Sequence, residues 1–272
     1  SMLGDTHIRA IFDYVDSKDC FPTVDISGGV SYFLWDAKHK TNCQFTNHFG
    51  GNSNTLPRKL DEFNIFVRNN GALSLIHKVK AMSKTMLNAQ ISPQTPFGFV
   101  STYRGTAQPE TDPTCVMLKS SGDASYVLRE DIKKNQQWID LYKVIFSKAT
   151  CEHAGTPDRN GQYRVLSALA LLQPQCVCTQ SYLVAGAYAT AEEAENLLTY
   201  LKTKFVRYLI LQTITSQDLS PEKFMFVPLQ NFTSKSDINW SAAVEEIDKQ
   251  LYEKYGVDEA ERSLIENTIK EM

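Results

Sequence analysis

Apolar and polar positions alternate over much of the first 150 residues, and this pattern predicts several short strands. The clearest cover residues 30–36 and 43–49, and the polar stretch 37–42 between them is typical of a hairpin tip. Residues 60–67 form a third strand candidate. Further along, glycine, proline, serine and aspartate separate four more predicted strands, at residues 97–103, 114–120, 124–130 and 141–149.

Helical spacing interrupts this pattern twice in the N-terminal half of the chain. Asp5 can cap a first helix. The apolar face of that helix would consist of Ile8, Ile11, Phe12 and Val15. Residues 72–82 predict a second, short helix, because Leu75, Ile76 and Val79 recur at helical intervals.

A polar loop over residues 151–164 and a β-rich run over residues 176–188 precede the clearest helix signal. Thr190 and Glu193 have the spacing of a capping box, in which each end of the motif satisfies a backbone N–H of the other. The apolar positions that follow predict one helix that continues to Leu209.

The last 50 residues predict a short strand and two helices. The strand covers residues 224–229, and the first helix places the apolar positions of residues 240–251 in line. Gly256 suits the position just after that helix, because glycine adopts the left-handed conformation found there. The final helix would begin at Asp258, with Glu261 three residues later.

These elements predict an α/β fold of the α+β type. We expect an irregular mixed sheet of many short strands, flanking helices and a helical C-terminal portion, since strands and helices do not alternate regularly enough for a doubly wound sheet. The predicted division places a β-rich portion at residues 1–189 and the helical portion, packed on it, at residues 190–272.

Composition is that of an ordinary globular protein, with 42% hydrophobic and 22% charged residues among 272. No apolar run approaches the length of a membrane span, and no signal peptide is visible near the N-terminus, so we expect no membrane association and a cytoplasmic protein. The six scattered cysteines indicate free thiols. Cys151 with His153, and Cys176 with Cys178, lack the spacing of common structural zinc sites.

The net charge of −3 conceals an uneven distribution. Residues 240–272 contain nine of the 31 acidic residues and four of the 28 basic ones, so the rest of the chain has 22 acidic and 24 basic residues. An acidic C-terminal segment can therefore coexist with a basic face elsewhere, and nucleic-acid binding is compatible with the overall charge.

Several catalytic motifs are missing from the sequence. It contains no P-loop, no dinucleotide-binding glycine motif, no His-Glu-x-x-His, no Gly-x-Ser-x-Gly and no Pro-Pro dipeptide. Gly28 and Gly29 precede a strand, so no helix N-terminus follows to hold a phosphate. The acidic pairs Asp61-Glu62 and Glu130-Asp131 could serve a metal-dependent nuclease, but charged pairs usually lie on solvated turns.

Four long segments carry a resemblance to a known family. Residues 20–36, which end in DISGGVSYFLWD, and residues 179–210, 224–232 and 238–272 resemble, in this order, the C-terminal region of large bacterial type II restriction–modification proteins. Those proteins fuse an adenine-N6 DNA methyltransferase, sometimes with a nuclease, to a C-terminal target-recognition domain. The loops around residues 104–135 and 150–170 depart from the family pattern, where target preference would vary.

The resemblance implies a module that binds double-stranded DNA sequence-specifically and has no catalytic centre of its own. Its partners would be DNA and the methyltransferase or nuclease part of the same polypeptide. That part would bind S-adenosylmethionine, and Mg²⁺ if a nuclease is present, so we expect no cofactor in this chain. Two alternatives stay open: a metal-dependent restriction endonuclease domain, and a protein-interaction module whose acidic C-terminal helices dock a partner subunit.

DNA contact requires polar or basic side chains in loops beside strands. The candidates that meet this description are Lys38, His39, Lys40, Asn47, Arg58, Thr102, Tyr103, Arg104, Lys119, Ser120, Arg129, Lys133, Lys134, Thr179 and Gln180. Arg104 is the strongest, because an aromatic residue precedes it and a glycine follows it. We interpret Gly28 and Gly29 as a structural corner, with close approach to a DNA phosphate as the alternative.

Overall fold

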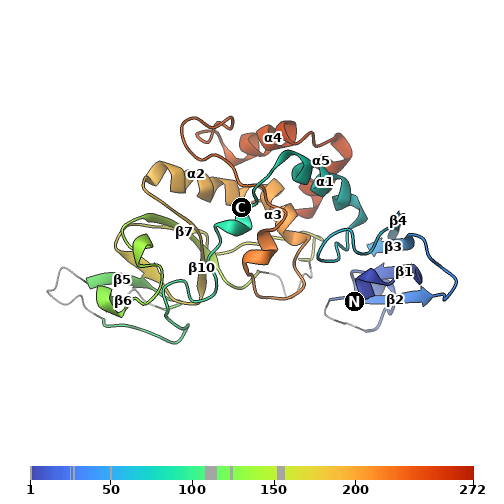
Figure 1. Ribbon diagram of the computed structural model, residues 1–272, viewed down its shortest axis with the longest axis horizontal. Helices are drawn as coiled ribbons and strands as arrows, with labels where there is room; N and C mark the ends of the chain where they lie inside the picture. The colour runs from blue at the N-terminus through green and yellow to red at the C-terminus, as the bar shows by residue number, and fades with distance from the viewer. Residues whose placement is uncertain are drawn as a thin grey trace.

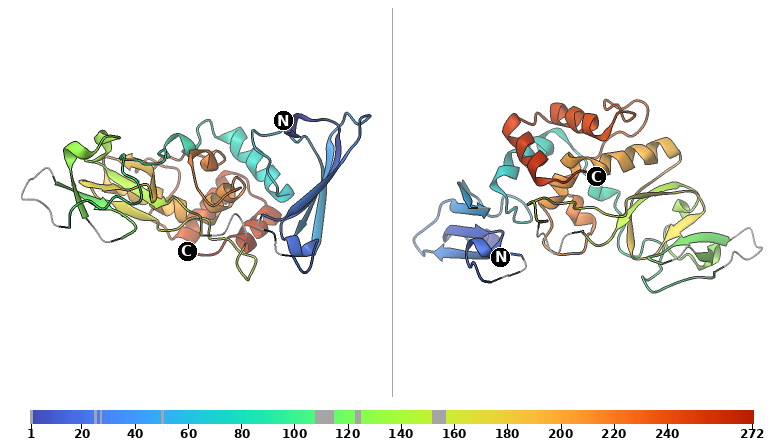
Figure 2. Two further views of the ribbon diagram at one scale, coloured as in Figure 1. Left: turned by 90° about the horizontal axis from the view of Figure 1, so that it is seen from below. Right: turned by 180° about the vertical axis from the view of Figure 1, so that it is seen from behind.

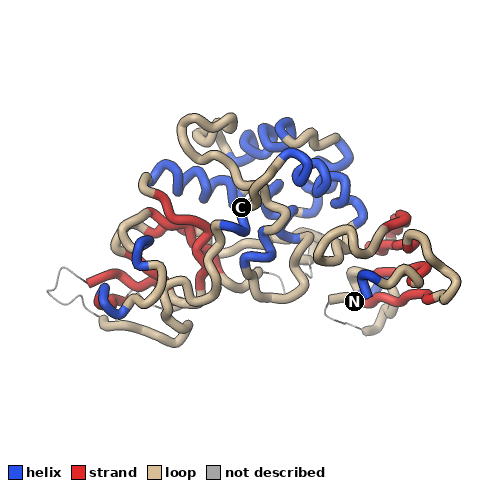
Figure 3. The backbone as a smooth tube through the Cα atoms, viewed as in Figure 1, coloured by secondary structure: helices blue, strands red, loops and turns tan. Residues whose placement is uncertain are grey.

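The protein is elongated, with strands at both ends and helices between them. The computed structural model describes residues 2–24, 26, 28–49, 51–107, 115–122, 125–151 and 157–272. An N-terminal sheet forms one end of the long axis, five helices form the middle of this described part, and two small sheets form the other end (Figure 1). The tube view shows the same separation of helix and strand (Figure 3). The predicted α+β class is confirmed.

The N-terminal sheet has four strands in the order β2-β1-β3-β4. Their bounds are β1 Ile8–Tyr14, β2 Val30–Trp35, β3 Cys43–Phe49 and β4 Asn52–Arg58. Strand β1 pairs antiparallel with β2 and parallel with β3, whereas β3 and β4 form an antiparallel hairpin. The strands predicted at residues 30–36 and 43–49 are confirmed, but they do not pair with each other because β1 lies between them.

Two predictions for this region are wrong. The segment after Asp5 is strand β1 and not a helix, because its β-branched and aromatic side chains are held between two partner strands. Residues 60–67 form no strand. They instead insert Leu60, Phe63 and Val67 into the core as an irregular segment.

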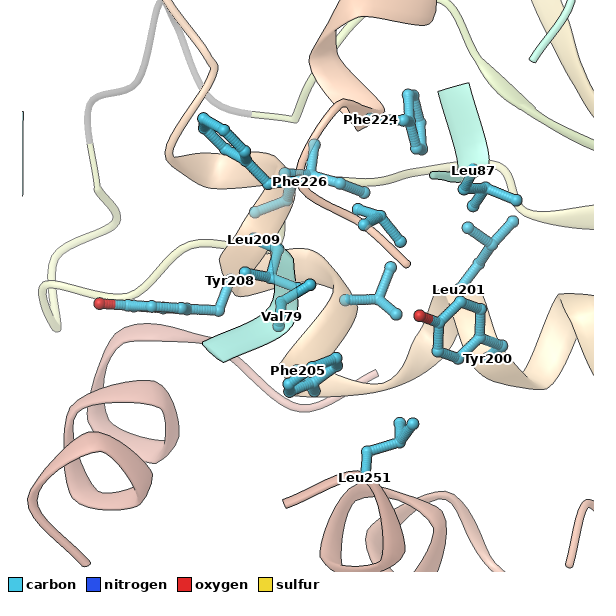
Figure 4. Packing of buried hydrophobic residues seen from close by; sticks show 14 of the residues in the cluster. Val79, Leu87, Tyr200, Leu201, Phe205, Tyr208, Leu209, Phe224, Phe226 and Leu251 are labelled. Atoms are coloured by element: carbon cyan, nitrogen blue, oxygen red, sulfur yellow. The ribbon is translucent and has the colours of Figure 1, made fainter. Parts of the chain in front are cut away.

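The middle of the molecule is built from helices around the largest hydrophobic core. Helix α1, Leu73–Met82, confirms the helix predicted over residues 72–82. Four further helices, α2 Ala191–Lys202, α3 Lys204–Leu211, α4 Val244–Lys254 and α5 Glu259–Thr268, surround the same core. Side chains from α1, α2, α3, α4 and the segment at Phe224 meet there, as Figure 4 shows.

The single helix predicted from Thr190 to Leu209 is divided at Thr203. Thr190 accepts a hydrogen bond from the backbone N–H of Glu193, so the start of α2 is confirmed. Thr203 has an extended backbone, and its side chain accepts from the N–H of Val206 at the start of α3. Asp248 of α4 adds two further acceptors there, and these caps stabilise a new helix start.

The remaining C-terminal predictions divide into two helices that form and a strand that does not, although α4 begins at Val244 and leaves Trp240 outside the predicted helix. Asp258 and Glu261 form the expected capping box of α5, and Gly256 has the positive φ of 60° expected after α4. Residues 224–229 are not a strand, because a short 3₁₀-helix at Pro221–Phe224 leads into turns there. The other 3₁₀-helices cover Met2–Gly4, Ser17–Asp19, Asn70–Ala72, Leu87–Ala89, Arg129–Asp131 and Gln136–Trp138.

The second end of the molecule, called the β-rich end below, contains two three-stranded sheets. One has the order β6-β5-β9 and the other the order β10-β7-β8. The strands are β5 Cys115–Lys119, β6 Ser125–Leu128, β7 Tyr142–Ser147, β8 Ala170–Leu172, β9 Cys176–Cys178 and β10 Tyr182–Tyr188. The strand predicted over residues 97–103 is wrong, because that segment forms turns and anchors itself through buried Phe97 and Phe99.

The β10-β7-β8 sheet lies between two cores. On β7, Val144 and Phe146 point into the helical core beside α2, whereas Ile145 points into a separate core shared with β5 and β9. The alternation follows from the two-residue period of a strand. Residues on both sides of position 189 share the helical core, and the predicted division at that position stays a prediction.

Within the residues that the structure describes, no helix is long and apolar enough to cross a membrane.

Candidate functional site

The sequence-predicted contact residues divide into two groups at opposite ends of the molecule (Figure 1). Five lie in the N-terminal sheet: Lys38, His39, Lys40, Asn47 and Arg58. The other ten lie in the β-rich end: Thr102, Tyr103, Arg104, Lys119, Ser120, Arg129, Lys133, Lys134, Thr179 and Gln180. One compact surface therefore cannot include all of them, and the larger group defines the candidate site.

Thr102, Tyr103 and Arg104 line one surface pocket of about 440 Å³. Tyr126 of β6 and Asp131 complete the wall opposite them. The pocket thus combines aromatic rings with a cationic donor and an anionic acceptor. Side chains of these kinds recognise the edges and faces of nucleic-acid bases.

The loop that carries Arg104 is fixed to the sheet below it. The backbones of Thr106 and Tyr126 exchange two hydrogen bonds of 2.9 Å, so the loop adds a short bridge to β6. Gly105 makes this approach feasible, because a side chain there would lie 2.4 Å from the carbonyl oxygen of Tyr126. The Tyr103 ring stacks on Phe99 with centroids 4.6 Å apart, which orients the aromatic wall.

Arg104 is exposed, and its guanidinium lies close to its own loop. Its Nη1 donates to the carbonyl oxygens of Ser101, at 2.7 Å, and Tyr103, at 3.1 Å. These bonds limit the rotamers of the side chain without burying its charge. The charged group is therefore held at the pocket rim, where a ligand can reach it.

Three lysines add positive charge to the same end. Lys119 lies exposed at the end of β5, Lys133 donates to the carbonyl oxygen of Glu130, and Lys134 donates to the Thr95 hydroxyl. Arg129 differs from these lysines, because it forms a two-pronged ion pair with Asp140. That pairing holds the pKa of Asp140 below its ordinary value and offsets the charge of Arg129.

The other polar candidates of this end serve its structure. Ser120 and Thr179 are buried. The backbone N–H of Thr179 donates to Lys119, and that of Gln180 donates to Phe99. These two bonds tie β9 and the turn after it to β5 and to the anchored loop.

A buried lysine that sequence patterns did not indicate supports the same region. Lys143 of β7 is fully buried, and its ammonium lies within hydrogen-bonding distance of four carbonyl oxygens, those of Trp138, Ile139, Leu141 and Gln173. Burial lowers its pKa to about 8. Through these contacts Lys143 links the turn before β7 to the segment after β8, and so stiffens the base of the β-rich end.

The first group of candidates offers fewer exposed contacts. Arg58 is only 4% exposed, donates to the carbonyl oxygen of Val67 at 2.7 Å, and lies over the rings of Phe45 and Phe66. Asn47 donates to Asp13. Arg58 is therefore a core residue, and we leave it out of the candidate contact surface.

The tip after β2 is the exposed part of the first group. Lys38 and Lys40 extend into solvent, while His39 lies near the carbonyl oxygen of Asn42. This tip is separated from the pocket by the whole helical middle of the molecule (Figure 1).

The geometry at Gly28 and Gly29 supports the interpretation of a structural corner. Both glycines have positive φ, and a side chain at Gly29 would lie 2.2 Å from the carbonyl oxygen of Tyr14. Arg68 fastens the corner, since it donates to the carbonyl oxygen of Gly28 and to both carboxylate oxygens of Asp13.

Replacing Gly29 with alanine is expected to lower the free energy of unfolding by about 2 kcal/mol, since the backbone must both move and adopt a strained conformation. Gly28→Ala, where a side chain meets open space, should cost only about 1 kcal/mol. Urea denaturation of the two variants measures the difference. Equal losses would contradict a role for close backbone contact at Gly29.

Candidate metal ligands do not come together in the described part of the chain. No group of three His, Cys, Asp or Glu side chains there could hold a metal ion. Glu62 of the first acidic pair contacts His77 at 2.6 Å. Of the weighed zinc ligands, His153 lies outside the described residues, and burial raises the pKa of the Cys178 thiol to about 12. All six cysteines are free thiols, as expected.

No protein-family model matches the chain, and no curated protein matches its sequence. A functional assignment therefore depends on the residues of the β-rich end and on their geometry.

Proposed function

We propose that this chain binds double-stranded DNA as the target-recognition portion of an adenine-N6 methyltransferase or restriction protein, and that the β-rich end makes the contacts. The observation that carries the proposal is the pocket shared by Thr102, Tyr103 and Arg104, in which an exposed guanidinium stands beside aromatic rings on an anchored loop. The sequence resemblance supports the same function.

In this proposal the chain selects and positions DNA but does not modify it. Arg104 donates to a base edge in the major groove, most favourably to the two acceptors of guanine. Lys119, Lys133 and Lys134 neutralise phosphates and set the register of the protein on the duplex. Methylation or cleavage, together with S-adenosylmethionine and Mg²⁺, belongs to another part of the protein, which acts in the cytoplasm.

The rigidity of the pocket suits sequence discrimination. The hydrogen bonds between Thr106 and Tyr126, and the stacking of Tyr103 on Phe99, are present before DNA arrives. Binding then loses little conformational entropy in the loop, and a mismatched base leaves those donors of Arg104 that are not bonded to its own loop without a base acceptor.

Arg104→Ala is expected to weaken binding to the preferred sequence by about tenfold, because one base contact contributes on the order of 1–3 kcal/mol. The measurement is fluorescence anisotropy on duplexes first selected from a random pool by the wild-type chain. Arg9→Ala provides the matched control, since Arg9 is an exposed arginine in the N-terminal sheet at the other end of the molecule.

Sequence and salt dependence separate the two kinds of contact. Replacing Lys133 and Lys134 with alanine should weaken binding to all duplexes alike and reduce the slope of log K against log salt by about 2. Arg104→Ala should instead reduce the preference for the selected sequence. Binding that is unaffected by either change, or no DNA binding at low salt, would contradict the proposed contact surface.

A further inference from the structure

Exposed apolar side chains are concentrated in the N-terminal sheet and its loops. Of the fifteen large hydrophobic residues that are exposed in the described part of the chain, ten lie between positions 2 and 56. They are Met2, Phe21, Val24, Ile26, Tyr32, Phe33, Leu34, Trp35, Phe49 and Leu56. A concentration of this kind marks an interaction surface more often than scattered surface residues do.

Strand β2 is the centre of this concentration. Tyr32, Phe33, Leu34 and Trp35 are 49–53% exposed, although consecutive residues of a strand point to opposite faces. Both faces of β2 are therefore uncovered. The strand is also at the edge of its sheet, and it contains no charged residue or proline to discourage pairing with another strand.

The two faces of the sheet differ in their cover. The sheet is mixed, with β1 and β3 parallel and the other two pairs antiparallel, and a face that such a sheet leaves to solvent is ordinarily polar. Here one face packs on residues 60–70, where Phe66 meets Phe45. The other carries stacked rings from three strands, with Tyr14 and His48 4.2 Å apart.

The outer face of the sheet looks away from the rest of the protein. Figure 2 (left) shows the sheet as the last layer at its end of the molecule, with the helices on one side only. A covering layer would bury the apolar side chains of that face.

We propose that the N-terminal sheet is the docking surface for a second protein domain of the α/β type. That domain adds a strand to the free edge of β2 and lays apolar helix faces over the exposed side chains on both sides. The proposal does not rest on DNA binding by the β-rich end.

The size and charge of the surface favour a protein partner. Half-exposed large side chains leave roughly 100 Å² each, so the six in the strands and the four in neighbouring segments together offer up to about 1,000 Å², compared with about 800 Å² for one partner in a standard interface. Strands β2 and β3 contain no Lys, Arg, Asp or Glu, whereas nucleic acid requires cations to meet its phosphates.

A second copy of this chain fits the surface less well. Two copies could pair β2 with β2, but each would bring the same bare sheet to the contact. The side chains on both faces would then stay exposed. A partner that supplies helices together with a strand covers the edge and both faces at once.

Site-specific photo-crosslinking in the native cell tests the proposal. Benzoylphenylalanine replaces Phe33 on one face, Leu34 on the other, or Met82, which is 58% exposed at the end of α1 and serves as the control position. The expected result is crosslinking from both 33 and 34, but not from 82, to one α/β protein or to a further segment of the same polypeptide. Peptide mapping should place the products on a strand and its neighbouring helices.

A second substitution guards against unspecific capture. Leu34→Lys should reduce the crosslinking yield from position 33 at least tenfold while leaving the Tm of the purified chain unchanged, since residue 34 is exposed in the chain alone. The proposal would be overturned by crosslinks to a second copy of this chain or to nucleic acid. It would also be overturned if positions 33 and 34 gave no more crosslinking than position 82.

Discussion

Replacing Arg207 with methionine is expected to lower the free energy of unfolding by about 4 kcal/mol. The side chain is 1% exposed, and its guanidinium donates to the carbonyl oxygens of Lys202, Thr203, Arg164 and Lys270. Methionine fills most of the volume but donates no hydrogen bond. Each buried carbonyl that loses its partner costs about 1–3 kcal/mol, and backbone acceptors cannot be removed by a compensating substitution.

Urea denaturation followed by far-ultraviolet circular dichroism measures this loss. Arg207→Lys keeps the charge and part of the donor set, so we expect about half of the effect. Lys249→Met removes an exposed cation from a surface pair with Glu246. It should change the free energy of unfolding by less than about 0.5 kcal/mol in either direction. A loss below about 1 kcal/mol for Arg207→Met would show that the carbonyls find other donors.

The second large effect concerns the pH dependence of stability at Asp248. This carboxylate is buried and accepts hydrogen bonds of 2.9 Å from the backbone N–H groups of Lys204 and Phe205, where α3 begins. Burial raises its pKa to about 6 from an ordinary value of 3.8. The folded protein then binds the proton more tightly than the unfolded chain does between these two values.

The sign of the effect follows from this difference in proton binding. The contribution of Asp248 to stability is greatest below pH 4 and falls as the pH rises to about 6, by about 3 kcal/mol in total. Asp248→Asn removes the titration but keeps a side-chain oxygen as acceptor. We therefore expect the free energy of unfolding of Asp248→Asn, relative to that of the wild type, to be about 3 kcal/mol higher at pH 7 than at pH 4.

Denaturation series at several pH values test the linkage. Asp248→Ala is the control, because it also removes the titration but lacks an acceptor for Lys204 and Phe205. It should be less stable than Asp248→Asn at every pH by about 1–2 kcal/mol. Profiles of wild type and Asp248→Asn that run parallel would contradict a raised pKa at this position.

Local sequence patterns predicted the helices with strong caps and three of the four strands that Gly, Pro, Ser and Asp separate, all but the one at residues 97–103. The capping box at Asp258 and the threonine cap at Thr190 form as expected, because each depends on contacts within four residues. The break at Thr203 was missed. It depends on Asp248, which lies 44 residues from Lys204 in the sequence, and no local pattern contains that contact.

In the N-terminal sheet, the prediction of strands also failed where it depended on contacts between distant parts of the sequence. Ile8, Ile11 and Phe12 fit one face of a helix, but they also fit a strand that is packed on both sides. Pairing of β1 with β2 and β3 decided between these possibilities. The predicted hairpin failed for a related reason, since hydrophobic alternation identifies strands but does not give their neighbours.

Only part of the candidate site could be predicted from the sequence. The Arg104 loop was predicted from its own residues, whereas Tyr126 and Asp131, which complete the pocket, come from later segments. Arg58 was predicted to contact DNA because it is basic and lies in a loop beside a predicted strand. Its burial depends on Phe45 and Phe66, which surround the guanidinium only after the chain folds.

The β10-β7-β8 sheet has a consequence for engineering by exchange of segments. Its two faces belong to two cores, with Phe146 in one and Ile145 in the other. A graft that replaced the whole β-rich end would exchange the second core intact but would cut through the helical core, where Val144 and Phe146 pack beside α2. Exchange limited to residues 101–107 would keep every buried strand, so variants of that loop on an unchanged frame are the direct way to test whether it sets the proposed DNA preference.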